Sequence, residues 1–223
     1  MGLFDFLKGK NGTTSTSSNV NVEPTPSPVS VAPTNGLLDL RKNDILDLTK
    51  YSDKLRNVRA AAGWAINERG RDYDLDLCAY LCDSKGSVLH TVYYGDKDYA
   101  GIYLDGDDLT GGGDKDNENI RVDFNNIPKN VQTIYFAVVI YEAESRHQVF
   151  GKVKNAYIRL VDSDARDYEI CRFSITDDGG DNSALLAAKL TRTGDAWSFG
   201  AIGTYSKDSI RSLRNKINNK KGR

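Results

Sequence analysis

The sequence has no long apolar run and few of the residues on which common metal and thiol sites depend. Among its 223 residues are two histidines, three cysteines and one methionine. No stretch of about eighteen apolar residues occurs, which argues against a membrane-spanning helix. The N-terminus also lacks the basic start, apolar core and small-residue cleavage site of a secretory signal, so we expect a cytoplasmic protein.

The scarcity of cysteine and histidine argues against two kinds of site. Cys78, Cys82 and Cys171 are odd in number and lie in apolar surroundings, as expected of reduced core thiols rather than disulfides. His90 and His147 are far apart in the sequence and no CxxC pair occurs. A zinc site is therefore not expected.

The net charge is also uninformative as a whole. Thirty basic and thirty-one acidic residues leave a formal net charge of -1. Such a balance gives no general signal for nucleic acid or for a membrane surface, so any electrostatic function must come from local clusters. We predict no nucleic-acid partner.

The first 36 residues differ from the rest of the chain. In residues 1–10 four apolar side chains fall on one side of a potential helix: Leu3, Phe4, Phe6 and Leu7. Residues 11–36 are rich in Ser, Thr and Pro and carry Glu23 as their single charge, which predicts a disordered linker. We expect residues 1–10 to dock on a protein partner, or to contact the inner face of the membrane weakly. The alternative is an unstructured start with chance hydrophobic residues.

Residues 37–206 have the pattern of one all-β domain. Short apolar runs rich in β-branched and aromatic residues alternate with clusters of Gly, Asp and Asn. The expected strands are 44–50, 55–66, 73–83, 87–94, 119–124, 132–143, 155–162, 168–175, 184–192 and 197–205. This number of strands predicts a two-sheet antiparallel β-sandwich with short peripheral helices. Residues 184–190 are equally compatible with a helical turn, because Ala and Leu favour helix.

Residues 207–223 are predicted to form a helix with a basic tail that packs on the domain. Ile210, Leu213 and Ile217 fall on one helical face, and the segment ends in Lys220, Lys221 and Arg223. The basic side chains are compatible with a phosphate-bearing partner or simply with a solvated helix end.

Two acidic clusters are the most informative feature of the sequence. In DYDLD, Asp72, Asp74 and Asp76 alternate with other residues, so a strand would place all three carboxylates on one face. Further along, three glycines are surrounded by six acidic residues: Asp105, Asp107, Asp108, Asp114, Asp116 and Glu118.

Clustered carboxylates repel one another, at a cost of roughly 0.6 to 2.5 kcal/mol for each pair 6 to 7 Å apart. Protonation, basic partners or a cation would relieve the repulsion. Calcium fits best, since it takes six to eight oxygen ligands in a flexible geometry and a Gly-rich loop can supply carbonyls. The spacing does not match an EF-hand. Solvated loops and strand edges are the alternative reading.

Several motifs resemble the TerD-like family of tellurium-resistance and stress proteins, from about Leu38 to Tyr205. In order along the chain they are GW (63–64), DYDLDLCAYL, DSKGSV, YYGDK, GDDLTGGGDKDNE, RHQVFGKVKNAYIRLVD and WSFGAIGTY. The resemblance implies a calcium-binding β-sandwich that acts without catalysis in a bacterial stress response, with protein partners in a membrane-associated complex.

The resemblance also implies the calcium ligands, for one or two ions. Carried over by position, they are Asp72, Asp74, Asp76, Asp107, Asp108, Asp114, Asp116 and Glu118. Gly112, Lys115 and Asn117 depart from the family pattern, so one of two calcium sites is expected to be weakened.

Two other classes of function remain open. A metal-dependent phosphohydrolase would use the acidic residues for Mg²⁺, but the acidic loop lacks the positive character of a phosphate loop. A calcium-dependent carbohydrate- or ligand-binding sandwich would use some of the twelve tyrosines for stacking. Arg159, on an expected strand, should pair with an acidic residue, for which Asp72 to Asp76 are candidates.

Overall fold

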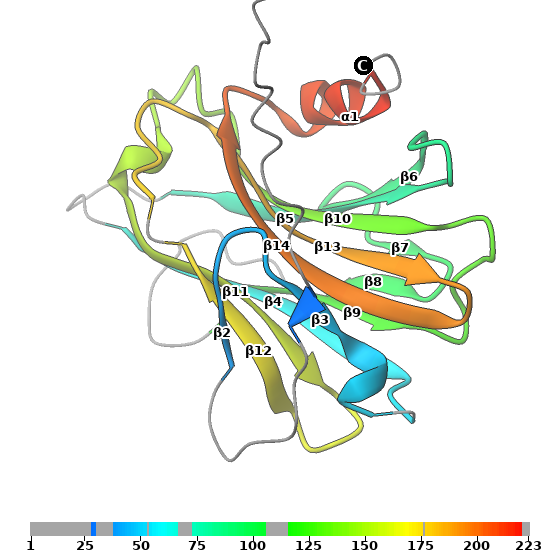
Figure 1. Ribbon diagram of the computed structural model, residues 1–223. Coiled ribbons are helices and arrows are strands. Elements are labelled where there is room, and N and C mark those ends of the chain that lie inside the picture. The colour runs from blue at the N-terminus through cyan, green and yellow to red at the C-terminus, as the bar shows by residue number, and fades with distance from the viewer. Residues whose placement is uncertain are drawn as a thin grey trace, which may run out of the picture.

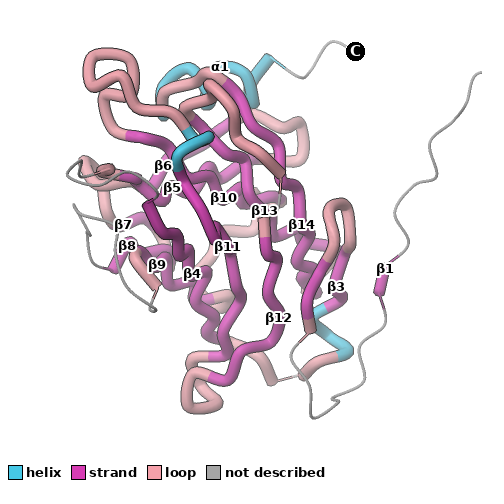
Figure 2. The backbone as a smooth tube through the Cα atoms, turned by 90° about the vertical axis from the view of Figure 1, so that its left-hand side faces the viewer, coloured by secondary structure: helices cyan, strands magenta, loops and turns pink. Residues whose placement is uncertain are grey.

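In a computed structural model, two β-sheets pack face to face and one helix covers the outer side of the first sheet (Figure 1). The structure describes residues 28–29, 38–52, 54–66, 73–105, 116–175 and 177–219. The predicted all-β sandwich is confirmed. The strands of the two sheets run in a similar direction (Figure 2), as in an aligned sandwich.

Each sheet contains seven described strands. Sheet A has the spatial order β1 (Pro28–Val29), β3 (Ile45–Asp47), β14 (Ala196–Ser206), β13 (Ala184–Thr193), β10 (Thr133–Ile140), β5 (Leu75–Cys82) and β6 (Val88–Val92). Sheet B has the order β2 (Asp39–Leu40), β12 (Tyr168–Ser174), β11 (Val153–Asp162), β4 (Asn57–Ile66), β9 (Glu118–Asp123), β8 (Ile102–Asp105) and β7 (Asp98–Tyr99). The strands pair antiparallel except for β1 with β3 and β2 with β12. Two short 3₁₀ turns, Leu48–Lys50 and Phe150–Lys152, are the peripheral helices.

The main core lies between the sheets. It is built from the inward residues of every long strand, among them Leu77, Ile120, Phe136 and Phe199, all of which are fully buried. Fully burying an aliphatic or aromatic side chain contributes about 1.5–3 kcal/mol, so this layer supplies most of the favourable free energy of folding.

A second core lies on the outer face of sheet A, under the helix α1 (Ile210–Asn219). Leu213 and Ile217 are buried there against Cys78 and other outward residues of sheet A. The Tyr80 hydroxyl donates to the Ile210 carbonyl at 3.0 Å, which fixes the start of the helix. The predicted C-terminal helix is confirmed. Within the described residues, no helix is long and apolar enough to cross a membrane.

The ambiguous segment 184–190 lies in the strand β13 (Ala184–Thr193). β13 lies between β14 and β10, and its residues Ala184 to Ala188 are buried on both faces of sheet A. Because the second core covers the outer face, the polar residues that would mark a half-buried strand are missing from this stretch.

Candidate functional site

Two of the predicted acidic residues lie at the start of β5. Asp74 precedes the strand and Asp76 is its second residue. Leu75 and Leu77 point into the main core, so Asp76 projects from the opposite face of the strand, as the predicted alternation requires. Asp76 is nevertheless only 4% exposed, which is unusual for a carboxylate.

A third predicted residue, Glu118, links the two sheets at this point. It is the first residue of β9 in sheet B and is 1% exposed. Its carboxylate accepts a hydrogen bond from the Leu77 N–H of β5 in sheet A. β6 pairs with β5 only from Ala79 onward, so this edge of β5 is left for Glu118 to reach. Burial raises the pKa of the Cys78 thiol, and the charges of Asp76 and Glu118 add to the increase.

Two tyrosine rings lie beside the β5 carboxylates. Tyr94 and Tyr141 meet edge to face with ring centroids 5.6 Å apart, and Tyr94 is 39% exposed. Burial raises the pKa of Tyr94, and the negative charges of Asp76 and Asp74 add to the increase. Arg146 lies 3.6 Å from Asp74, measured from Nη1 to Oδ2. The neighbourhood therefore combines carboxylates with an exposed aromatic rim.

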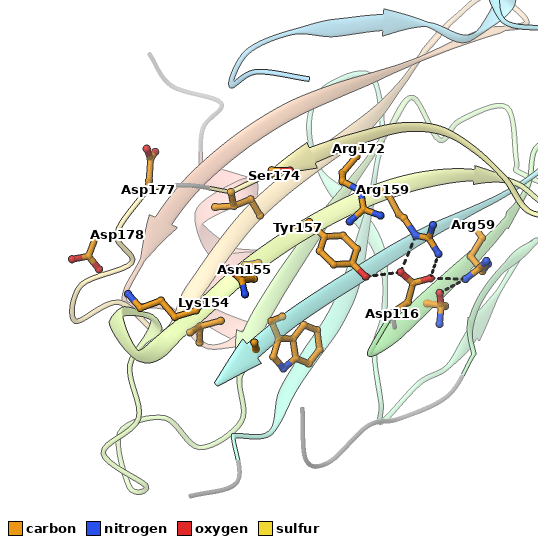
Figure 3. A pocket seen from close by; sticks show the side chains of 16 residues that line it. Arg59, Asp116, Lys154, Asn155, Tyr157, Arg159, Arg172, Ser174, Asp177 and Asp178 are labelled. Atoms are coloured by element: carbon orange, nitrogen blue, oxygen red, sulfur yellow. Dashed lines mark hydrogen bonds and ion pairs between the residues drawn. The ribbon is translucent and has the colours of Figure 1, made fainter. Parts of the chain in front are cut away.

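Asp116 lies on the outer face of sheet B, within a cluster of cationic side chains (Figure 3). Arg159 donates to it from Nε (2.8 Å) and Nη2 (2.7 Å), Arg59 from Nη1 (3.0 Å) and Tyr157 from its hydroxyl (2.9 Å). Burial alone would raise the pKa of Asp116, but the hydrogen bonds from Arg159 and Tyr157 and the charges of both arginines hold it below the usual value. We call Arg59, Tyr157 and Arg159 the arginine cluster.

Asn117 connects these two neighbourhoods. Its side-chain oxygen accepts from the Trp64 N–H at 2.8 Å, and its own N–H donates to the Ala62 carbonyl at 2.9 Å. The consecutive residues Asp116, Asn117 and Glu118 are thus each bonded to a different part of the sandwich. The departure of Asn117 from the family pattern has a structural role here, because its side-chain carbonyl holds the end of β4.

The arginine cluster is supported by further charges on the same face. Arg159 and Arg172 lie directly opposite each other on β11 and β12. Glu169 bridges them, with hydrogen bonds of 2.6 Å from Arg159 and 2.9 Å from Arg172. Arg159 is paired with acidic residues, but its partners are Asp116 and Glu169 rather than the described candidates Asp74 and Asp76. The sequence could not show this, because Asp116 is 43 residues away from Arg159.

The arginine cluster opens into a groove of about 1080 Å³ across β4, β11 and β12, lined also by Lys154 and Ser174. Tyr157 packs between the Arg172 guanidinium, 4.1 Å from the ring centroid, and the backbone of β4 at Gly63. A Cβ atom at Gly63 would lie 2.3 Å from Cζ of Tyr157, so only glycine lets this ring lie against β4.

The predicted ligands and docking residues divide into three groups. The structure brings Asp74, Asp76 and Glu118 to the start of β5, and it places Asp116 in the arginine cluster. Outside the described residues lie Asp72, Asp107, Asp108, Asp114, Leu3, Phe4, Phe6 and Leu7. The described residues alone contain no group of three or more His, Cys, Asp and Glu side chains arranged to hold a metal ion.

The cysteines and one histidine have structural surroundings. All three thiols are free and buried, as expected of core cysteines. Burial raises the pKa of Cys78 and of Cys82 to about 12, so neither is a thiolate near neutral pH. His90 pairs with Asp96 at 3.1 Å and stacks on Tyr99.

Comparison with known proteins identifies the family. The model of the TerD domain matches residues 37–216. The chain belongs to the TerD domain family. Among curated relatives, general stress protein 16U of Bacillus subtilis is 33% identical over 174 residues, covering 75% of this chain and 90% of that protein. Tellurium resistance protein TerD of an Alcaligenes species is 34% identical, covering 74% and 89%.

A solved structure agrees with the fold of this TerD domain. A homologue of telluride resistance protein (TerD) from Streptomyces coelicolor A3(2) superposes with a TM-score of 0.61, covering 72% of this chain and 95% of that one. The identity is 17%, so the likeness concerns the fold. The curated relatives are named as resistance and stress proteins, which agrees with the family assigned from the motifs.

Proposed function

We propose that this TerD domain binds calcium in the cytoplasm and acts without catalysis in a stress response such as tellurite resistance or phage defence. The observation that carries the proposal is that two almost fully buried carboxylates lie at the same end of β5: Asp76 is part of the strand, and Glu118 of sheet B accepts a hydrogen bond from the N–H of the next residue, Leu77. A bound cation would offset the cost of burying two like charges at one end of a strand.

The donor set fits calcium better than other cations. The residues proposed as ligands offer only oxygen atoms, which hard cations prefer. Asp74, Asp76 and Glu118 lie at the start of β5, whereas Asp107, Asp108 and Asp114 lie outside the described residues and are proposed from the sequence motif alone. Magnesium needs fewer carboxylates and a stricter octahedron. When bound, calcium would supply positive charge that offsets the repulsion among these groups. The chain's own residues supply the frame, because Glu118 holds β9 to β5.

Thermal unfolding with calcium and with a chelator tests the proposal. We expect a higher melting temperature in calcium, and identical curves would contradict calcium binding.

The end of the sandwich at the start of β5, which bound calcium would make more rigid, is proposed as a surface for a protein partner. Residues 1–10 are proposed as a tether to that partner or to the membrane. Replacing Leu3, Phe4, Phe6 and Leu7 by Ser is expected to release most of the protein from the bound fraction of a cell lysate. The variant Val20→Ser/Val22→Ser, which removes apolar residues outside this segment, serves as the control. An unchanged distribution of the fourfold variant would contradict the tether.

A further inference from the structure

The carboxylate of Asp116 has all of its hydrogen-bonding capacity satisfied by neighbouring side chains. A carboxylate has about four lone-pair sites, and Asp116 accepts four hydrogen bonds, two on each oxygen. Its side chain is 7% exposed. The Nε and Nη2 atoms of Arg159 bind the two oxygens separately, in the bidentate geometry that makes Arg–carboxylate pairs both strong and specific.

The arginine cluster is held in place by contacts that do not involve Asp116. Arg159 also donates to Glu169, and Arg59 also donates to Asn119 at 2.6 Å. Tyr157 is fixed between β4 and the Arg172 guanidinium. These contacts orient the donors independently of Asp116, so little side-chain entropy is lost when the donors form hydrogen bonds to its carboxylate.

We propose that Asp116 is a positioning residue of the calcium site rather than a ligand. Its contact with Arg59, Tyr157 and Arg159 clamps the C-terminal end of the acidic segment to sheet B. The clamp fixes where Glu118, two residues later, enters the space beside β5. This proposal rests on the proposed calcium function.

The clamp predicts a change in calcium affinity on replacement of Arg159 that is opposite in direction to the change expected from charge alone. By Coulomb's law, removing the positive charge of Arg159 from the vicinity of a calcium site should strengthen calcium binding. The increase should be larger still if the removal left Asp116 available as a calcium ligand. If Arg159 instead fixes the chain that carries Glu118, its loss should weaken calcium binding. Removing a side chain that orients a metal ligand typically lowers the affinity for the metal by 10–100-fold.

Calcium titration calorimetry of the full chain separates these outcomes. Arg159→Gln and Asp116→Asn are each expected to weaken calcium binding by about tenfold or more with unchanged stoichiometry. The double variant should bind calcium no more weakly than the single variant with the lower affinity. Arg159→Lys, which keeps the charge but loses the bidentate geometry, should also weaken binding.

Arg56→Gln is the matched control, since it removes the same charge from an exposed position that precedes β4. Unchanged or stronger calcium binding is expected for this control. Unchanged or tighter binding in Arg159→Gln would overturn the proposal, and so would the loss of one bound ion in Asp116→Asn.

Unfolding in chelator distinguishes failure of the clamp from failure of the calcium function. The melting temperatures of the single and double variants should change non-additively in EDTA, whether or not the wild type binds calcium. Additive changes would overturn the clamp. A wild type that does not bind calcium would instead overturn the proposed function.

Discussion

Removal of calcium is expected to lower the melting temperature of the protein by roughly 6–12 °C. A ligand that binds only the folded state stabilises it by about 3 kcal/mol at a hundredfold excess over its Kd. For a domain of this size, 1 kcal/mol corresponds to about 2–4 °C. The effect should be large because the carboxylates of Asp76 and Glu118 come from different sheets, so calcium binding would stabilise the contact between the sheets.

The comparison requires melting curves in calcium, in EDTA and after calcium is restored. Magnesium at the same concentration is the control, and it should give a smaller increase because its octahedral geometry suits this donor set less well. Curves that coincide in calcium and EDTA would show that no stabilising site exists.

Substitution of Glu118 should separate its structural role from its role toward calcium. Glu118→Ala removes the acceptor of the buried Leu77 N–H, and an unsatisfied buried donor costs about 1–3 kcal/mol. Glu118→Gln keeps an amide oxygen in the same place, so the free energy of unfolding in EDTA should stay close to that of the wild type. Both variants should lose most of the calcium-dependent increase in melting temperature.

The exposed Glu144 supplies a matched control, because Glu144→Gln removes the same charge from the surface without touching the link between the sheets. It should behave as the wild type in both conditions. A full calcium-dependent increase in Glu118→Gln would show that the Glu118 carboxylate is not needed for the site.

The main features of the fold are predictable where one side of an element is buried and the other is not. The period-two pattern of Leu75 and Leu77 against Asp76 survives in β5, and the helical spacing of Leu213 and Ile217 survives in α1. Residues 184–188 give no such signal, because the two cores bury both of their faces. Ala184 and Leu186 belong to the core under α1, which follows them in the sequence.

The candidate site was predictable only in part, for a similar reason. Clustered charge in the sequence points to Asp76 and Glu118, and in the structure Glu118 accepts from the N–H of Leu77, the residue after Asp76 in β5. The partner of Asp116 could not be predicted, since charge density does not show which way a side chain points. The available signal was Arg159 on a strand next to apolar neighbours, which indicates a paired arginine but does not name its partner.

Terbium luminescence tests the central claim, that the cation binds beside Asp74 and Asp76. Terbium is a hard, oxygen-binding substitute for calcium, and an aromatic ring close to it transfers excitation energy. Excitation of the aromatic rings should give terbium emission that calcium abolishes, and Tyr94→Phe should weaken the emission without preventing binding. The double variant Asp74→Asn/Asp76→Asn should lose the emission. Full emission from that variant, or none from the wild type, would contradict a calcium site at the start of β5.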